Sequence, residues 1–240
     1  MKVDPARTVK ENRLAASRLK KYLKGAEIGF RDSWGTDIST PAARRRAWWD
    51  FQLMDHSFLR RWWTNFDKVA DGVYRANQPA PHRIATYAAM GIKTIINLRG
   101  VGRHSHYLFE REACAAHGIR LADRRLFAGK LPLPGELLEL YAEFLTAEKP
   151  FLLHCKSGAD RAGLAAALYL MLIEDVPVEV AHKQLHWRYL HFRDSRTGIL
   201  DYFLDRYAED HAKTGIGLLD WITRVYDRDA MTAAYHARKR

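Results

Sequence analysis

The chain has 240 residues, of which 48% are hydrophobic and 28% charged, enough for one globular domain with a sizeable core and extensions. Its two cysteines exclude a disulfide framework and fit a reducing compartment, and no stretch approaches the roughly 20 apolar residues of a membrane span. Residues 1–24 are too charged for a signal peptide, so we expect a cytoplasmic protein, at most peripheral to a membrane.

The formal net charge is +11 and it is unevenly distributed. Residues 1–65 hold 14 Lys and Arg against 7 Asp and Glu, and five of the seven tryptophans. Such a segment suits anionic lipid headgroups or another polyanion, although the favoured interpretation is that its tryptophans pack onto the rest of the protein. No nucleic-acid-binding module is recognisable, so we expect no nucleic-acid partner.

The N-terminal part predicts a basic helix over residues 4–25, a loop over 29–41 and a second helix over 44–59 with one apolar face. From residue 66 on, short β-branched strands alternate with helices. The predicted strands are 68–70, 73–75, 93–98, 119–122 and 151–154, and the predicted helices are 82–90, 107–117, 136–147, 161–174, 177–190 and about 198–208.

This alternation favours an α/β domain with a central, mainly parallel sheet flanked by helices, preceded by a helical N-terminal extension. We expect three parts: a basic, Trp-rich helical extension over residues 1–65, a catalytic domain over 66–208 and a basic helical tail over 209–240. The tail has an apolar face that predicts a packing helix rather than a membrane anchor.

The chemistry is predicted in ten residues between the strand 151–154 and the helix 161–174, with the sequence HCKSGADRAG. A loop of this kind binds phosphate, because unpaired amides and the positive end of a helix both favour an anion. The same field favours the thiolate of Cys155, which is the nucleophilic form, and Arg161 supplies a planar fork for two phosphate oxygens. The predicted substrate-binding residues are His154, Lys156, Ser157, Gly158, Ala159, Asp160 and Arg161.

The string His154-Cys155-x5-Arg161 resembles the signature of the protein tyrosine phosphatase superfamily, most closely that of compact, atypical dual-specificity phosphatases. Segments 72–79, 94–100 and 184–189 extend the resemblance over about residues 66–207. It implies a dual-specificity phosphatase-like fold and a cysteine-dependent phosphomonoester hydrolase that acts through a phosphocysteine intermediate without a cofactor. We expect no metal, since the histidine pairs of the chain lack an evident third ligand.

Two departures from the family pattern keep alternatives open. Ala162 stands where many members carry Ser or Thr, a hydroxyl that helps the sulfur leave the phosphoenzyme, so a catalytically weak phosphate-binding or scaffold protein is one alternative. Asp160 and Lys156 are similar to the loops of phosphoinositide phosphatases, so a lipid or inositol phosphate is the alternative to a phosphorylated protein as substrate. A third alternative is a rhodanese-like fold, which also has a Cys loop before a helix. The segments 72–79 and 94–100 disfavour it.

The leaving oxygen of a phosphate ester needs a proton, and two carboxyl groups are candidates for the general acid. The resemblance places the acid after an upstream strand, which fits Asp123, 32 positions before Cys155. Asp160 in the loop is the rival. Without a catalytic role, Asp123 would be an acid at a strand end that pairs with Arg124 or Arg125, and Asp160 would be a carboxylate that shapes the loop. The sequence does not decide which of the two is the general acid.

Overall fold

The computed structural model describes residues 34–238, so the helix predicted over 4–25 lies outside the described residues. The described chain forms two compact units. One consists of residues 34–56 together with Arg103–Leu108, and the other of Ser57–Gly102 and the chain from Phe109 on.

The first unit contains helix α2 (Pro41–Trp49) and the π-helical turn η1 (Asp50–Met54). The hydroxyl of Thr40 accepts a hydrogen bond from the N–H of Ala43 (3.2 Å), and proline occupies the first helical position, so the helix start follows from the sequence. The side chain of Phe51 is fully buried in this unit.

The helix predicted over 44–59 is wrong in extent. His56 adopts a left-handed conformation (φ 60°), which ends the helical path. The next residues form a separate 3-10 turn, η2 (Ser57–Arg61), in the second unit.

The tryptophans of the N-terminal part are largely exposed, and their packing onto the rest of the protein stays a prediction. Four of the five keep at least 40% of their surface exposed: Trp34, Trp48, Trp49 and Trp62.

The second unit contains a five-stranded sheet in the order β1-β2-β5-β3-β4. The strands are β1 (Asp67–Ala70), β2 (Val73–Asn77), β3 (Thr94–Asn97), β4 (Arg120–Asp123) and β5 (Phe151–Cys155). Strands β1 and β2 form an antiparallel hairpin, and all other neighbours pair in parallel. The predicted α/β class with a mainly parallel sheet is therefore confirmed. Every residue of β5 is buried, as the apolar character of a central strand requires.

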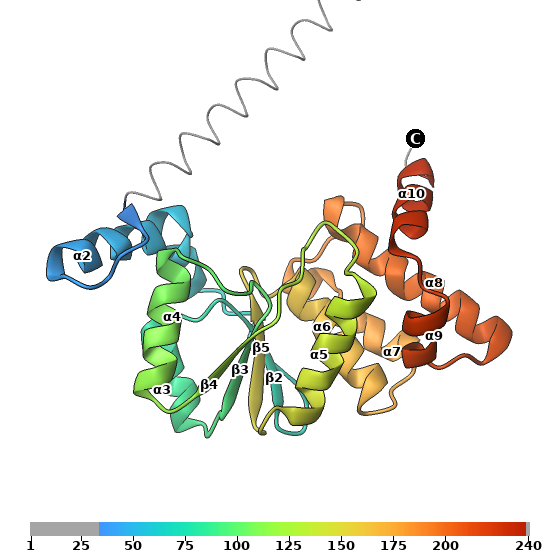
Figure 1. Ribbon diagram of the computed structural model, residues 1–240, viewed down its shortest axis with the longest axis horizontal. Coiled ribbons are helices and arrows are strands. Elements are labelled where there is room, and N and C mark those ends of the chain that lie inside the picture. Colours follow the sequence, from blue (N-terminus) through green and yellow to red (C-terminus); the bar gives the residue numbers. More distant parts are fainter. Residues whose placement is uncertain (1–33, 239–240) are drawn as a thin grey trace, which may run out of the picture. The chain divides into compact units, whose positions relative to one another are not determined.

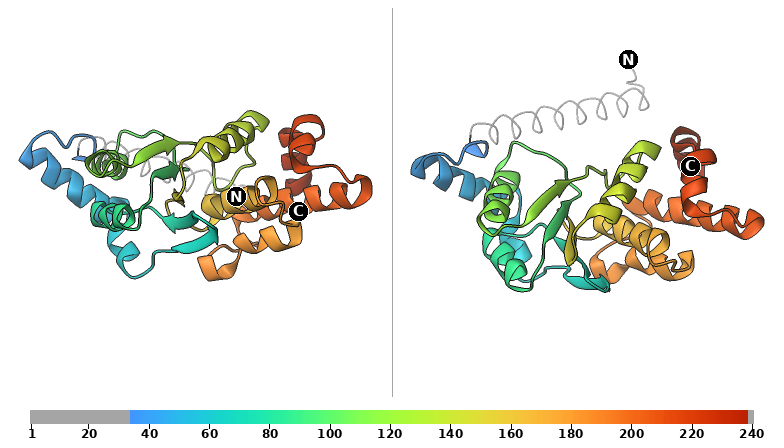
Figure 2. Two further views of the ribbon diagram at one scale, coloured as in Figure 1. Left: turned by 90° about the horizontal axis from the view of Figure 1, so that it is seen from below. Right: turned by 60° about the horizontal axis from the view of Figure 1, so that its bottom comes forward.

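Helices cover both faces of this sheet (Figures 1 and 2). One face carries α3 (Pro81–Ala89) and, from Phe109 on, α4 (Ser105–Ala116). The other face carries α5 (Pro134–Thr146) and α6 (Asp160–Leu172). The remaining helices pack outside these two: α7 (Val178–Ala181), α8 (Ile199–Thr214), α9 (Leu218–Arg224) and α10 (Arg228–Arg238). The larger apolar core lies between β5 and this second group of helices.

The single helix predicted over 177–190 is wrong. Short pieces replace it: α7, η3 (His182–Gln184) and η4 (Trp187–Tyr189), followed by η5 (Arg196–Gly198) before α8. The chain leaves the helical path at Leu185 (ψ 85°), and the carbonyl of Gln184 accepts a hydrogen bond from Arg75 instead of continuing a helix.

The C-terminal helices pack into the larger core. Trp221 is fully buried, with its ring 5.3 Å from that of Phe203 in an edge-on arrangement. The C-terminal tail therefore packs against the core, as expected. Helix α8 runs continuously across residue 208, where the sequence predicts a domain boundary, and that boundary stays a prediction. Among residues 34–238, no helix has both the length and the apolar character that a membrane crossing needs.

Candidate active site

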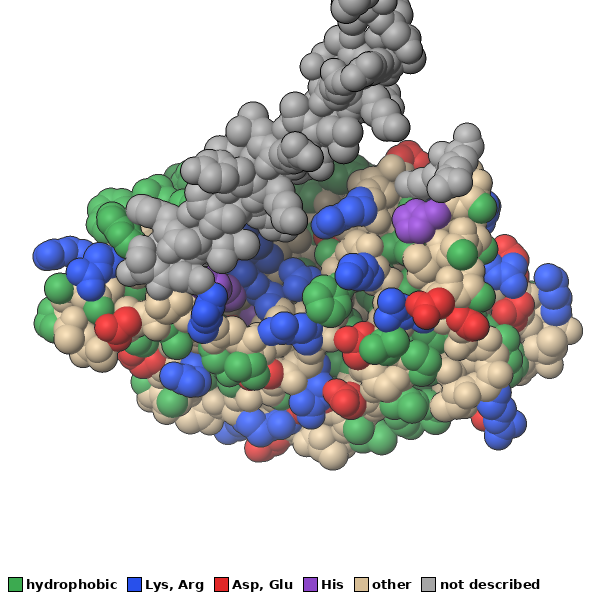
Figure 3. Space-filling view, turned by 45° about the horizontal axis from the view of Figure 1, so that its top comes forward, with side chains coloured by type: hydrophobic (Ala, Val, Ile, Leu, Met, Phe, Trp, Pro, Cys, Tyr) green, Lys and Arg blue, Asp and Glu red, His purple; other side chains and the backbone are tan. Residues whose placement is uncertain are grey.

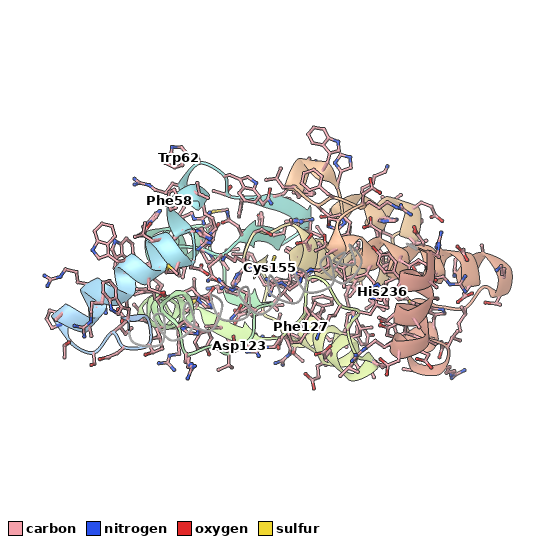
Figure 4. All side chains as sticks on the ribbon, turned by 90° about the horizontal axis from the view of Figure 1, so that it is seen from above. Phe58, Trp62, Asp123, Phe127, Cys155 and His236 are labelled. Atoms are coloured by element: carbon pink, nitrogen blue, oxygen red, sulfur yellow. The ribbon has the colours of Figure 1, made fainter. Side chains whose placement is uncertain are left out.

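The carboxyl ends of the parallel strands lie at one edge of the sheet. In the strand register Asn77 is opposite Cys155, and Asn97 is opposite both Asp123 and His154. Figure 4 views the molecule toward this edge, with Cys155 near the centre. Ligands of open parallel sheets bind at such an edge, so the predicted loop occupies the expected place.

Cys155 ends the central strand and is 1% exposed. Its Sγ accepts a hydrogen bond from the N–H of Gly158 (3.2 Å), so at least one loop amide points at the sulfur. The second cysteine, Cys114, is buried in the cluster on the opposite face of the sheet, and burial raises the pKa of its thiol. Cys114 is thus the small buried hydrophobe expected from the sequence.

All four carbonyls of the loop 156–159 accept hydrogen bonds from elsewhere in the second unit. The donors, in loop order, are the N–H of Gln78 to Lys156 (3.2 Å), Nδ2 of Asn65 to Ser157 (2.9 Å), and the guanidinium of Arg75 to Gly158 (2.6 Å) and Ala159 (3.1 Å). Because the C=O and N–H of a peptide point in opposite directions, this arrangement turns the amides toward the inside of the loop. Such a concave set of amides binds anions.

Arg75 supplies two of these bonds from β2 and has no exposed surface. Its other nitrogen donates to the carbonyl and to the side chain of Gln184 (both 2.7 Å), and its guanidinium lies 3.7 Å from the ring centre of Tyr189. Burial lowers the pKa of Arg75 to about 10, which leaves it charged at neutral pH. Sequence reasoning missed this role, although an arginine inside a buried strand was a usable signal.

Two glycines allow the loop and α6 to approach their neighbours closely. Gly158 has φ 74°, and a Cβ there would lie 2.7 Å from backbone atoms of Ala76 and Asn77. A Cβ on Gly163 would lie 2.7 Å from the carbonyl oxygen of Gln184. A side chain at either position would push the loop away from the strand or the segment that holds it.

His154 is fully buried, and its Nε2 lies 2.7 Å from a carboxylate oxygen of Glu110. The other oxygen of Glu110 accepts from Gln78 (2.9 Å), whose own oxygen accepts from Arg99 (2.9 Å). This buried network connects β5 to α4 and β2 beneath the loop.

Arg161 lies in the first turn of α6 and is partly buried. One terminal nitrogen is 3.5 Å from the carbonyl oxygen of Leu98, a weak hydrogen bond. Its Nε is buried and has no hydrogen-bond partner among residues 34–238. The Nε atoms of Arg75 and Arg124 are also buried without a partner in this part of the chain, so the feature is shared by several arginines.

Asp123 ends β4 and accepts a hydrogen bond from Nδ2 of Asn97 (2.8 Å). It lies two strands from β5, or about 10 Å between backbones. Figure 4 shows Asp123 and Phe127 near Cys155 in the view onto this edge. Arg124 donates to the main-chain oxygen of Asp123 (2.8 Å) and its guanidinium pairs with Glu143 (2.7 Å).

Asp160 begins α6, and its Oδ1 lies 2.8 Å from Nδ1 of His191. The two predicted acids are therefore in different settings. One is at a strand end opposite an asparagine, and the other is bonded to a buried histidine. No three or more His, Cys, Asp or Glu side chains of the described chain are grouped so that they could hold a metal ion.

The anchoring of the loop yields a first prediction. Replacing Arg75 by Lys keeps a charge but loses the fork that reaches several acceptors, so some of the buried carbonyls lose their partners. We expect the free energy of unfolding in a denaturant titration to fall by about 1–3 kcal/mol, and the affinity for vanadate to fall with it.

Arg188→Lys is the matched control, since Arg188 also lies against the ring of Tyr189 (4.6 Å) but is exposed to solvent. Unchanged vanadate affinity and stability in Arg75→Lys would contradict the anchoring.

One family model matches the part of the chain that contains the loop 156–159. Residues 134–183 match the model of a family described as the tyrosine phosphatase family. No curated protein sequence matches the chain.

Several solved structures are similar at low identity. TpbA of P. aeruginosa is 19% identical (TM-score 0.49) and covers 72% of this chain and 91% of its own. The core catalytic domain of the PP-IP phosphatase SIW14 from S. cerevisiae is 17% identical (TM-score 0.48), covering 63% and 93%. A putative phosphatase from Shewanella putrefaciens is 14% identical (TM-score 0.47), covering 60% and 93%.

The family match spans the helix before β5, the strand itself, the loop and α6. It therefore covers the segment that carries the signature His154-Cys155-x5-Arg161 at the carboxyl end of the central strand, and this segment is similar to the tyrosine phosphatase family.

Proposed function

We propose that this protein hydrolyses phosphomonoesters as a cysteine-dependent phosphatase of the dual-specificity type. The observation that carries the proposal is the loop whose four carbonyls are held from outside, while the amide of Gly158 points at Sγ of Cys155. The unpaired Nε of Arg161 supports it, because a bound phosphate would complete its hydrogen bonding.

In the proposed mechanism the thiolate of Cys155 attacks phosphorus in line with the ester oxygen. The S–P bond forms while the P–O bond to the leaving group breaks, and a carboxylic acid gives its proton to the departing oxygen. The loop amides and Arg161 stabilise the equatorial oxygens. Water then attacks phosphorus, the carboxylate takes a proton from that water, and inorganic phosphate and the thiolate are released.

We assign the general acid to Asp123. The leaving oxygen stands beyond the phosphorus on the side away from the sulfur, so the acid must reach over the loop rather than lie within it. A side chain at the end of a strand two places away can do so from about 10 Å. The hydrogen bond from Asn97 fixes its direction.

Phosphorylated protein is the first substrate class that we propose. A lipid or inositol phosphate is the second, favoured by the concentration of positive charge at the strand ends. Arg99, Arg124, Arg125 and Lys156 all follow strand ends at this edge, and Figure 3 shows Lys and Arg side chains gathered around a hollow on this side of the molecule. The basic residues 1–65 would then serve as contact for an anionic membrane surface.

The first test of the function is removal of the nucleophile. Cys155→Ser should lower the hydrolysis of p-nitrophenyl phosphate by about three orders of magnitude or more, because the hydroxyl is a far weaker nucleophile. The variant should still bind vanadate. Cys114→Ser is the control and should keep activity. Hydrolysis by Cys155→Ser near the wild-type rate would refute the mechanism.

Leaving-group dependence tests the acid. A phenolate needs a proton more than p-nitrophenolate does, so Asp123→Asn should slow phenyl phosphate hydrolysis by about 10²–10⁴ and p-nitrophenyl phosphate much less. Loss of the alkaline decline in the pH–rate profile should accompany this. Equal losses on both esters would exclude Asp123 as the acid.

Phosphate release from a panel decides the substrate class. We expect a phosphotyrosine peptide to be the better substrate if the protein class is right, and a soluble inositol polyphosphate or a phosphoinositide in anionic vesicles if the second class is right. Ala162, fully buried, brings no hydroxyl to the loop. A stoichiometric burst without turnover on every substrate would instead indicate the weak phosphate-binding alternative.

A further inference from the structure

A chain of polar side chains leads from the phosphate loop into the helical side of the second unit. Asp160 at the start of α6 contacts His191 (2.8 Å), and the other ring nitrogen of His191 contacts Asp201 in α8 (2.8 Å). The second oxygen of Asp201 contacts His182 in η3 (3.1 Å), which also lies 3.8 Å from Asp205. Four separate segments therefore meet through these side chains.

The geometry defines the protonation of His191. Each of its ring nitrogens lies at hydrogen-bond distance from a carboxylate oxygen, and carboxylates only accept. A neutral imidazole has one N–H, so as long as Asp160 and Asp201 are both ionised, both contacts are satisfied only by the imidazolium. His191 is 3% exposed and Asp201 is equally buried, so neither contact is readily replaced by water.

The charges agree with this geometry. Burial disfavours the cation, but the hydrogen bonds with Asp160 and Asp201 outweigh it and raise the pKa of His191 to about 9. Burial likewise opposes the charge of Asp201, yet its bonds with His182 and His191 lower its pKa to about 2.

We infer that His191 is a positioning residue of the phosphate loop, holding Asp160 as an ionised acceptor at the start of α6 and thereby excluding it as the proton donor. The inference rests on the proposed function. Asp160 directly precedes Arg161, so fixing its carboxylate fixes the backbone from which the phosphate-binding guanidinium extends. Asp201 orients the imidazolium from behind.

His191 lines a pocket of about 430 Å³ on the helical side of the second unit. Its charged and titratable groups lie on the elements packed around the histidine: Glu179, His182, Lys183, His186, His191, Arg193, Asp194 and Asp201. Of the groups that face His191, Asp160 and Asp201 are the two that raise its pKa.

The test compares Asp160→Asn, His191→Gln and the double variant with His117→Gln, an exposed histidine in the turn after α4. We expect each of the first two to lower kcat by about ten- to a hundredfold through misplacement of the loop. The loss of kcat should be the same for phenyl and p-nitrophenyl phosphate. The double variant should have the same kcat as either single variant, because each single substitution already removes the contact between Asp160 and His191. His117→Gln should match the wild type.

The pH dependence of stability is the second readout. The pKa of His191 is raised in the folded state, so its contribution is fully present below about pH 6.5 and is lost as pH rises through about 9. The melting temperature of the wild type should fall over this range, and that of His191→Gln should lack this component. If His191→Gln does not fold, Asp201→Asn takes its place and should move the fall toward lower pH.

A larger loss of Asp160→Asn on phenyl phosphate than on p-nitrophenyl phosphate would make Asp160 the acid and overturn the inference. A His191→Gln variant with wild-type kcat and wild-type pH dependence would overturn it as well. If the wild type releases phosphate from no substrate, the proposed function fails, while the melting curves still show separately whether His191 is held as a cation.

Discussion

The hydrogen bonds that hold the four carbonyls of residues 156–159 are the constraint on which the rest of the site depends. A loop of this length has alternative conformations in which its amides face solvent, and only donors placed outside it select the one with the amides inside. Of those donors, Arg75 and Gln78 belong to or directly follow β2, and Asn65 precedes β1. The neighbouring strand therefore determines the shape of the loop as much as its own sequence does.

Arg75 shows how such a constraint is made stable. A fully buried cation is costly, and the paired terminal nitrogens of Arg75 offset this cost, although its Nε has no partner among the described residues. Here the guanidinium donates to backbone carbonyls on two segments and to Gln184, and it stacks on Tyr189. The carbonyl of Gln184 that accepts from Arg75 lies in the irregular segment 182–190, just before the chain leaves the helical path at Leu185.

The two aspartates illustrate how identical residues are placed in different settings, from which we propose different roles. Asp123 lies at a strand end opposite Asn97, and Asp160 is bonded to a buried imidazolium. A carboxylate that accepts from a cation is stabilised in its charged form, which suits anchoring rather than proton donation. Burial and partner, rather than sequence position near the cysteine, separate these roles.

The sequence by itself determined the alternation of strands and helices, the hairpin at β1 and β2, and the place of Cys155 between a buried strand and α6, because these depend on local periodicity and on turn residues. Only the tertiary structure decided that Arg75 meets Gly158, that Asn65 meets Ser157 and that His191 meets Asp160. These partners are 83, 92 and 31 positions apart, and no local pattern encodes such contacts. Local periodicity likewise predicted a helix over 177–190, but the structure has short helical pieces there, and the carbonyl of Gln184 accepts from Arg75, 109 positions away.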